Sequence, residues 1–277
     1  MGLLNTPQRK AALAALVALL APFAFAKPPL TAPLSSHVDL KDMTWVEVRT
    51  ALAAGFTTVI VPTGGIEQNG PHMILGKHDY IVGQAADKIA LAVGHALVAP
   101  IVTYVPEGEY EPPTGHMRFP GTIGVPEPVF AGVLDGIARS LKAGGFKTIV
   151  FIGDHGGSQP AQAAVAQKLT TAWSREGVKV ASIDAYYDDK AQITRLLAEG
   201  QSLETIGQHA SLIDTSELLS VNPKGVDLTR YRAISAASEA TGVSGDPSAA
   251  SGERGASLLE MRIKAATAAI KALVATH

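Results

Sequence analysis

The feature that most constrains this chain is an alternation of short β-branched runs with segments of helical periodicity. The strand-like runs cover residues 57–62, 96–105, 147–152 and 178–184. The helical segments cover residues 44–54, 81–93, 126–143, 159–176 and 191–199. Because neighbouring parallel strands are joined by helical crossovers, this alternation predicts an α/β fold with a mostly parallel sheet and helices on both faces.

The last part of the chain departs from this alternation. Residues 235–254 are rich in Ser, Gly and Ala, which indicates a connecting loop. Residues 256–275 then carry apolar side chains at helical spacing, so we expect a terminal amphipathic helix with one face to dock. We find no internal repeat and no linker that would divide the chain.

The N-terminus has the pattern of a secretory signal peptide. Arg9 and Lys10 precede an almost wholly apolar run over residues 11–23, and a small-residue triplet follows at 24–26. A membrane anchor is the alternative, but the apolar stretch is shorter than the ~20 residues that a spanning helix needs. We therefore expect cleavage of residues 1–26, and a periplasmic or secreted domain over residues 27–277 without a membrane span.

Composition excludes several classes of protein. The chain has no Cys, which excludes a Cys-ligated metal site and a Cys nucleophile. Its 23 Lys and Arg residues nearly balance 25 Asp and Glu residues, and no long basic run follows the N-terminus. That charge pattern offers no attraction for a phosphate backbone, so we expect no nucleic-acid partner.

Two segments that follow predicted strands combine carboxylate and imidazole groups. Residues 62–72 read Pro-Thr-Gly-Gly-Ile-Glu-Gln-Asn-Gly-Pro-His and continue to Gly-Lys-His-Asp at 76–79. Residues 153–158 read Gly-Asp-His-Gly-Gly-Ser. In open parallel sheets, ligands bind at the carboxyl ends of the strands, so these segments are candidates for the site. Either alone is compatible with an ordinary turn.

The donor types in these segments favour a divalent metal. Carboxylate oxygen and imidazole nitrogen suit Zn, Mn or Fe(II), and a catalytic centre keeps three protein ligands with one position open. A third candidate segment, residues 208–217, contains His209 and Asp214, although Asp214 also fits the N-terminal cap of a helix. A fourth, residues 113–123, contains His116 and Arg118, which suit either substrate binding or a solvated turn.

These segments together resemble the motifs of the creatininase (creatinine amidohydrolase) family. Residues 62–79 are similar to its Pro-x-Gly-Ser-x-Glu-Gln-His-Gly-Pro-His-Leu-Pro-Leu-x-Thr-Asp motif, and residues 153–158 to its Asn-Gly-His-Gly-Gly-Asn turn. Three further motifs match in order: Phe-Pro-Gly-Thr-Ile at 119–123, a His-Ala segment at 209–216 and Gly-Asp-Pro at 245–247. The resemblance covers nearly all of the chain after residue 26.

The resemblance implies a three-layer α/β/α fold, a divalent metal and hydrolysis of a C–N bond in a small amide or cyclic amide. It marks Glu67, Asp79 and His155 as metal ligands, with His78 as a rival to Asp79 because of one extra residue in the first motif. Two departures matter. Asn69 stands where the family usually has a metal-binding His, and Gly157 stands where creatininases have an acidic residue. We therefore expect one tightly bound ion.

In the expected mechanism, the ion activates a water that attacks the amide carbon, and His209 or Asp214 carries the proton to the leaving nitrogen. His116 holds the substrate or its oxyanion. Asn69, His72, Arg118 and Gly157 are expected to contact the substrate.

Two alternatives stay open from the sequence. One is an exported protein that binds a small solute on the same fold with a degenerate metal site. The other is a related hydrolase that opens a ring or cleaves a C–O or C–C bond. The resemblance also implies a homo-oligomer.

Overall fold

The computed structural model describes residues 37–234 and 240–275. The expected signal peptide at 1–26 and the first residues of the expected loop, 235–239, lie outside the described residues. Among the described residues, no helix is both long enough and apolar enough to span a membrane.

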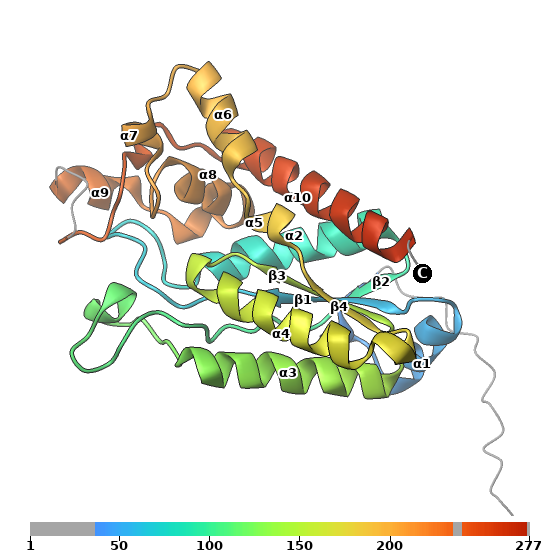
Figure 1. Ribbon diagram of the computed structural model, residues 1–277. Helices are drawn as coiled ribbons and strands as arrows, with labels where there is room; N and C mark the ends of the chain where they lie inside the picture. Colours follow the sequence, from blue (N-terminus) through green and yellow to red (C-terminus); the bar gives the residue numbers. More distant parts are fainter. Residues whose placement is uncertain (1–36, 235–239, 276–277) are drawn as a thin grey trace, which may run out of the picture. The chain divides into compact units, whose positions relative to one another are not determined.

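The centre of the described fold is a parallel sheet (Figure 1). Its strands are β1 (Thr58–Thr63), β2 (Ala96–Val98), β3 (Thr148–Gly153) and β4 (Lys179–Ser182). The spatial order is β2-β1-β3-β4, and Thr58 of β1 pairs with Ala96 on one side and with Thr148 on the other. Every pairing is parallel, which confirms the sheet that the alternation predicts.

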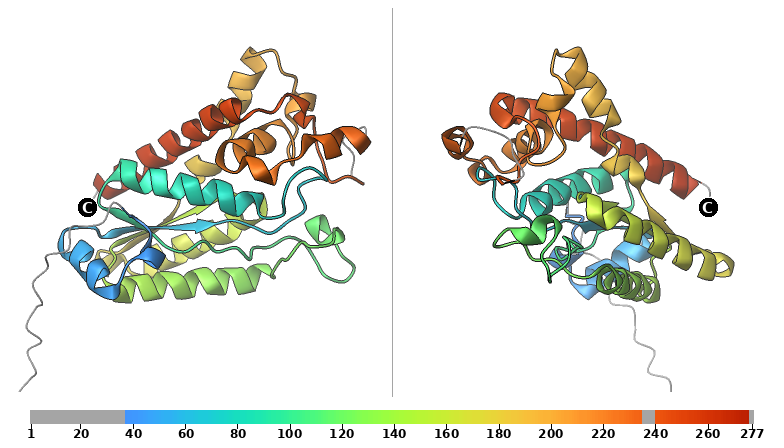
Figure 2. Two further views of the ribbon diagram at one scale, coloured as in Figure 1. Left: turned by 180° about the vertical axis from the view of Figure 1, so that it is seen from behind. Right: turned by 60° about the vertical axis from the view of Figure 1, so that its left-hand side comes forward.

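Helices cover both faces of the sheet, so the expected three-layer α/β/α arrangement is confirmed (Figure 2). The helices are α1 (Trp45–Ala53), α2 (Lys77–Val93), α3 (Glu127–Gly144), α4 (Gln159–Ala172), α5 (Asp184–Tyr187), α6 (Lys190–Ala198), α7 (Leu203–Ile206), α8 (Leu212–Val221), α9 (Leu228–Ile234) and α10 (Gly252–Ala275). Helices α2 and α10 lie on one face, and α1, α3 and α4 on the other.

The two hydrophobic cores follow from the alternation of side chains along each strand. Ile60, Val150 and Ile152 point to the face covered by α2 and α10. Val59 and Phe151 point to the opposite face, beneath α3 and α4. Because successive strand residues point to opposite faces, a strand buried on both faces reads as a continuous apolar run.

Several helix ends have the local chemistry that the sequence indicates. Thr44 and Glu47 form a capping box at the start of α1, in which each side chain accepts a hydrogen bond from the other residue's backbone N–H. Helix α3 has Pro128 in its first turn and is followed by Gly145, whose φ of 108° is the left-handed conformation that favours glycine. These residues set where α1 begins and where α3 stops.

The structure differs from the expected elements in several places. Strand β2 ends at Val98 rather than continuing to 105, because Pro100 follows and beyond it only Val102 bridges to β1, at Thr63. Helix α2 begins at Lys77, four residues before the expected start. Helix α10 begins at Gly252, inside the stretch expected to be a loop.

Helices α5, α7 and α9 were not expected from the sequence, and α8 was expected only in the interpretation of Asp214 as a helix cap. Helix α8 is buried around most of its circumference, at Leu212, Thr215, Ser216, Glu217 and Leu218, so it lacks the amphipathic stripe by which surface helices are identified. Its N-cap position is Ser211, so the interpretation of Asp214 as the cap is wrong. Asp214 lies in the first turn instead.

Candidate metal centre

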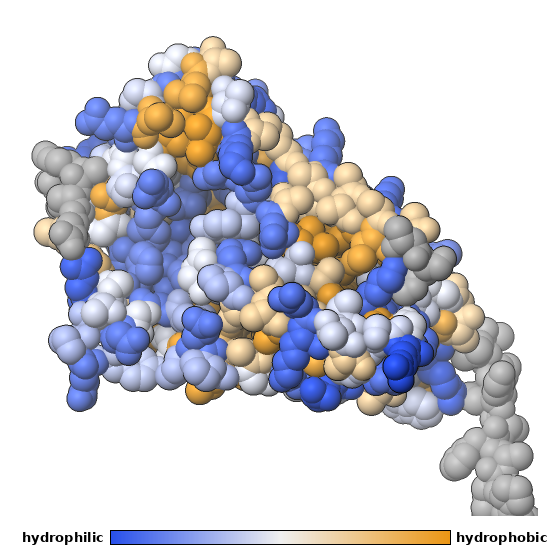
Figure 3. Space-filling model, in the orientation of Figure 1, coloured by the Kyte–Doolittle hydropathy of each residue, from blue (hydrophilic) through white to orange (hydrophobic). Residues whose placement is uncertain are grey.

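The polar segments after β1 and β3 meet at the carboxyl edge of the sheet. The loop after β1 carries Glu67, the turn after β3 carries Asp154 and His155, and the first turn of α2 carries Lys77 and His78. They line a cavity of about 310 Å³. On the left of the face seen in Figure 3, beneath α6 and α7, the surface is hydrophilic and hollowed.

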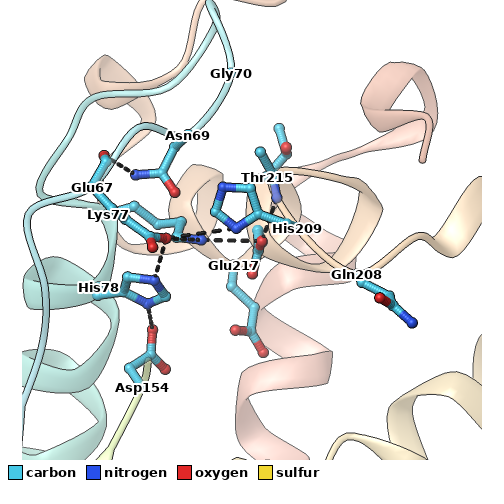
Figure 4. Close-up of polar contacts among 12 residues, drawn as sticks. Glu67, Asn69, Gly70, Lys77, His78, Asp154, Gln208, His209, Thr215 and Glu217 are labelled. Atoms are coloured by element: carbon cyan, nitrogen blue, oxygen red, sulfur yellow. Dashed lines mark hydrogen bonds and ion pairs between the residues drawn. The ribbon is translucent and has the colours of Figure 1, made fainter. Parts of the chain in front are cut away.

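Glu67 is the central residue of this cavity and is 0% exposed. On one side of its carboxylate, Oε1 lies 2.7 Å from His78 Nε2, 3.4 Å from Lys77 Nζ and 3.6 Å from His209 Nδ1. Figure 4 shows these groups pointing toward the same carboxylate, His78 and Lys77 from α2 and His209 from the segment before α8. Glu67 is thus surrounded by nitrogen groups on this side.

The other oxygen of Glu67 faces a set of metal-ligand types. Glu67 Oε2 lies 3.1 Å from His155 Nε2 and 3.2 Å from His116 Nε2, where His116 is carried by the 3-10 helix η2 (Gly115–Arg118). Glu107 Oε2 is also 3.1 Å from His155 Nε2. One donor atom from each of Glu67, Glu107, His116 and His155 lies within 4.8 Å of the others.

The donors of this set fit a divalent ion. Glu67 Oε2 and both oxygens of Glu107 are buried and accept no hydrogen bond, because the imidazoles of His155 and His116 meet Glu67 Oε2 and Glu107 Oε2 only in ion-pair contacts. Buried carboxylate oxygens are costly when they are unpartnered, and an ion between them and the imidazoles would satisfy them. Carboxylate and imidazole are the ligands expected for Zn, Mn or Fe.

Burial raises the pKa of Glu107 and lowers that of His116, whereas the pKa values of Glu67 and His155 shift because buried opposite charges attract each other. Burial would raise the pKa of Glu67, but the charges of His78 and Lys77 outweigh it and hold that pKa well below its usual value. Burial would lower the pKa of His155, yet its close contacts with the carboxylates of Glu107 and Glu67 raise it to about 10. Without an ion, His155 therefore keeps a proton where a metal would bind.

Of the two rival ligands on α2, the structure places His78 in the cavity and Asp79 behind the loop. Asp79 Oδ1 accepts a hydrogen bond from Gly65 N–H at 3.1 Å, and its Oδ2 accepts one from the Thr103 hydroxyl at 2.8 Å. Gly64 permits this approach, because a Cβ there would lie 1.8 Å from Asp79 Oδ1. Asp79 is turned about 100° from His78 around the helix axis, which directs its carboxylate to Gly65 and Thr103 instead of Glu67.

A line of buried charges supports His78 from behind. Asp154 Oδ2 lies 2.7 Å from His78 Nδ1, and Asp154 Oδ1 lies 2.8 Å from Arg262 of α10 (Figure 4 shows the first contact). Tyr186 donates its hydroxyl to the same oxygen at 3.0 Å. Arg262 in turn pairs with Glu217 of α8 at 2.8 Å. Both ring nitrogens of His78 thus contact carboxylates, and Asp154 fixes the ring that in turn orients Glu67, so His78 stands behind the candidate ligands and is not one of them.

The two candidates for proton transfer have different surroundings. His209 precedes α8 and faces the cavity with Nδ1, and burial lowers its pKa to about 4. Asp214 Oδ2 accepts a hydrogen bond from Ala210 N–H at 2.7 Å and lies 3.1 Å from Lys77 Nζ. Asp214 is therefore held by two donors, whereas His209 keeps a ring nitrogen directed into the cavity.

Comparison with known proteins identifies the family. The family model described as creatininase, creatinine amidohydrolase, matches residues 41–270. The chain belongs to the creatininase family. A creatinine amidohydrolase of Pseudomonas putida is 27% identical over 202 residues, which make up 71% of this chain and 76% of that relative.

Solved creatininases share the fold. A creatinine amidohydrolase crystal structure matches with a TM-score of 0.69 and 25% identity, over 85% of this chain and 97% of that one. A manganese creatininase matches with a TM-score of 0.69 and 24% identity, over 85% of this chain and 98% of that one. The expected class, a metal-dependent hydrolase of the creatininase type, is confirmed by the family match.

Of the residues expected to contact substrate in this creatininase-family site, Gly157 lines the cavity. A Cβ at Gly157 would lie 2.7 Å from His155 Cε1 and 2.9 Å from the Pro106 carbonyl oxygen, so the turn has no room for a side chain as it stands. Arg118 is exposed, donates from Nε to the Gly115 carbonyl and lines a second hollow beside His116.

The side chains of Asn69 and His72 point away from the cavity. The Asn69 amide donates to the Glu67 carbonyl at 3.0 Å and lies near two further carbonyl oxygens, so it braces its own loop. His72 is buried with Nε2 at 3.0 Å from the Thr215 hydroxyl. Their side-chain geometry gives no support to a substrate-binding role for either residue.

Sequence reasoning missed Glu107, Lys77 and Gln68. Glu107 lies two residues beyond the run expected to be the second strand, so the argument from strand ends would have found it. Lys77 and Gln68 lie inside the first motif, but nothing in their spacing distinguishes them from loop residues. Their importance comes from burial and from contacts across the fold.

Proposed function

We propose that this chain is an exported amidohydrolase that uses one divalent ion to cleave the C–N bond of a small amide or cyclic amide. The observation that carries the proposal is the set of buried, unpartnered carboxylate oxygens on Glu67 and Glu107 around His155. Glu67, Glu107 and His155 are the ligands in this proposal, and the His116 imidazole faces them. Three protein ligands are typical of catalytic sites that keep a position open.

When bound, the ion acts as a Lewis acid that polarises the substrate carbonyl and lowers the pKa of a water molecule. A single ion is supported by two positions: Asn69 stands where the family motif usually has a metal-binding His, and Gly157 where creatininases have an acidic residue. Asn69 directs its amide to backbone carbonyls, and Gly157 has no side chain. Manganese and zinc are both candidates, since the donors are carboxylate and imidazole.

His209 is proposed to act as the general acid–base group that transfers a proton to the leaving nitrogen. Its lowered pKa, about 4, keeps the imidazole neutral near pH 7. A neutral ring with Nδ1 directed into the cavity can accept a proton and return it to the leaving nitrogen of the substrate. Asp214 is less suited to this task, because its Oδ2 is held by Lys77 and by Ala210 N–H.

The cavity supports a small, polar substrate. A volume of about 310 Å³ lies at the lower end of the range for small-molecule sites. Its walls include charged and amide groups in and beside α6 and α7, among them Asp189, Gln192 and Gln208. A small amide or cyclic amide fits this size and polarity.

A matched pair of substitutions tests the site. Glu107→Gln removes one buried carboxylate beside His155, whereas Glu109→Gln changes an exposed carboxylate two residues away. We expect Glu107→Gln to lower metal affinity about 10–100-fold and to abolish most amide hydrolysis. Glu109→Gln should match the wild type in both. Equal metal affinity and equal turnover in all three proteins would contradict the assignment.

The solute-binding alternative gives a different result in the same assay. A protein that only binds a solute would leave a small amide uncleaved, with or without added Zn or Mn.

Export and homo-oligomer formation stay predictions from the sequence. Recovery from the periplasm or medium of a chain that begins at Lys27 supports export, and a cytoplasmic chain that begins at Met1 contradicts it.

A further inference from the structure

Gln68 contacts the imidazoles of His116 and His209 at the ring nitrogens that point away from the Glu67 carboxylate. It follows Glu67 in the loop after β1 and is buried. Its side-chain nitrogen Nε2 lies 3.0 Å from His116 Nδ1 and 3.0 Å from His209 Nε2. The opposite nitrogen of the His116 ring, Nε2, faces Glu67 Oε2 at 3.2 Å. Gln68 therefore contacts His116 at one end of the ring, and the candidate metal centre lies at the other.

The orientation of the Gln68 amide follows from its other contact. Gly70 N–H donates to Gln68 Oε1 at 3.0 Å. If the amide were reversed, its NH₂ group would face the Gly70 N–H, and two donors would oppose each other. The backbone of Gly242 packs against the same amide, since a Cβ there would lie 2.0 Å from Oε1. The oxygen of Gln68 is thus fixed toward Gly70, and the nitrogen toward His116.

This orientation determines the tautomer of His116. An amide nitrogen donates hydrogen bonds and does not accept them, so His116 Nδ1 must be the acceptor. In a neutral imidazole the hydrogen is then on Nε2, the atom that faces Glu67. His209 is not constrained in the same way, because its Nε2 also lies 2.9 Å from the Gln68 carbonyl oxygen, which only accepts.

We propose that Gln68 is a positioning residue that keeps His116 in the tautomer with hydrogen on Nε2. In that form His116 donates a hydrogen bond into the cavity and does not ligate the metal, because a ligating nitrogen must be free of hydrogen. Glu67, Glu107 and His155 then remain as the protein ligands. The use of this N–H donor in catalysis rests on the proposed function. The assignment of the tautomer rests only on the contacts of Gln68.

The chemical use of such a donor is stabilisation of developing negative charge. When the amide carbon is attacked, its carbonyl oxygen gains charge, and a neutral imidazole N–H held in place stabilises it without having to reorient. Removing one donor of this kind commonly costs about 10²–10³ in kcat. Gln68 acts on this step only through His116.

Histidine nitrogen NMR tests the tautomer directly. In zinc-loaded protein labelled with ¹⁵N at histidine, we expect His116 to show a protonated Nε2 and an unprotonated Nδ1, and His155 to show a metal-shifted nitrogen. His116→Gln identifies the resonances. A protonated Nδ1 on His116, or a metal-shifted Nε2, would overturn the inference.

Gln68→Glu reverses the hydrogen-bond polarity without changing the size of the side chain. The carboxylate still accepts from Gly70 N–H, but it accepts from His116 Nδ1 as well, so the hydrogen moves to Nδ1 and Nε2 becomes a free ligand. We expect zinc affinity to rise about tenfold and kcat to fall about 10²-fold, with a much smaller change in KM. Unchanged zinc affinity and an unchanged His116 spectrum would contradict the proposal.

Gln162→Glu is the matched control for a new buried carboxylate. Gln162 is 0% exposed, and its amide donates to the Ser158 hydroxyl rather than to an imidazole. Its variant should leave the His116 nitrogen shifts as in the wild type. The two proposals fail separately: a protein that hydrolyses no amide but shows His116 with hydrogen on Nε2 loses the proposed function and keeps the positioning role of Gln68.

Discussion

At the scale of single residues, Lys77 is a buried cation that pairs with carboxylates of the site. Its side chain is 1% exposed, and its ammonium lies 3.1 Å from Asp214 and 3.4 Å from Glu67. Burial would lower the pKa of Lys77, but these two carboxylates outweigh it and raise the pKa above its usual value. Lys77 is therefore a permanent countercharge for the carboxylates that face it.

Removing this countercharge should destabilise the fold. Lys77→Met keeps most of the side-chain volume but leaves Asp214 and Glu67 without their cation, and breaking a buried pair costs about 3–5 kcal/mol. Denaturant unfolding of metal-free protein measures this loss. Lys88→Met, at an exposed position of the same helix α2, should change stability by less than about 0.5 kcal/mol. Equal stability of the two variants would contradict the account.

His72 should make folding stability depend on pH. Burial lowers its pKa to about 4, against about 6.5 in the unfolded chain. Between these values the unfolded state takes up a proton and the folded state does not, so stability is lost as the pH falls from 6.5 toward 4. The loss approaches about 3 kcal/mol. His72→Gln should flatten this part of the stability–pH curve, and an unchanged slope would refute the assignment.

Some residues of the site could be predicted from sequence motifs, and others could not. Glu67 and His155 could be predicted because each follows a strand in a glycine-rich turn. Glu107 follows the run expected to be the second strand, so the same argument marks it as a candidate, but only the structure shows it 3.1 Å from His155. The choice between His78 and Asp79 was open in the sequence, because the sequence does not fix which side of the first turn of α2 faces Glu67.

At the scale of elements, α8 and α10 are held together by a glycine contact. Gly255 of α10 packs against the backbone of α8, and a Cβ there would lie 1.7 Å from the Ser216 carbonyl oxygen. The contact brings Arg262 of α10 to Glu217 of α8 and to Asp154 at the end of β3. The spacing of these two helices therefore affects the support behind His78.

Two glycine substitutions in helices should have opposite effects. Gly255→Ala forces α8 and α10 apart, and overpacking of this kind costs about 1–3 kcal/mol. Gly136→Ala in α3 meets no atom within 4 Å and should stabilise the protein by about 0.5–1 kcal/mol through helix propensity. Chemical unfolding of both variants provides the comparison. A stabilising Gly255→Ala would contradict the described packing of α8 on α10.

The sequence predicted the amphipathic elements well and the buried or short ones poorly. Helices α1 and α3 have caps and a single apolar face, so their ends follow from local chemistry. Helix α8 is buried around most of its surface and α5 has four residues, so neither gives a periodic signal. Tertiary packing, and not local preference, determines these two.

At the scale of the whole molecule, the parallel sheet explains why distant segments share one site. All described strands run in the same direction, so the loops after β1 and β3 end at the same edge of the sheet. This convergence could be predicted from the alternation of strands and helices. The side-chain distances could not, because they depend on segments that have no regular structure, such as the one that carries Glu107.

The central claim is that one metal ion binds at Glu67, Glu107 and His155. Elemental mass spectrometry of the metal-replete protein, after removal of loosely bound ions, tests it most directly. The account predicts about one equivalent of Zn, Mn or Fe per chain, and less than about a tenth of that in Glu107→Gln and His155→Ala after the same treatment. Two equivalents per chain, or none, would contradict it.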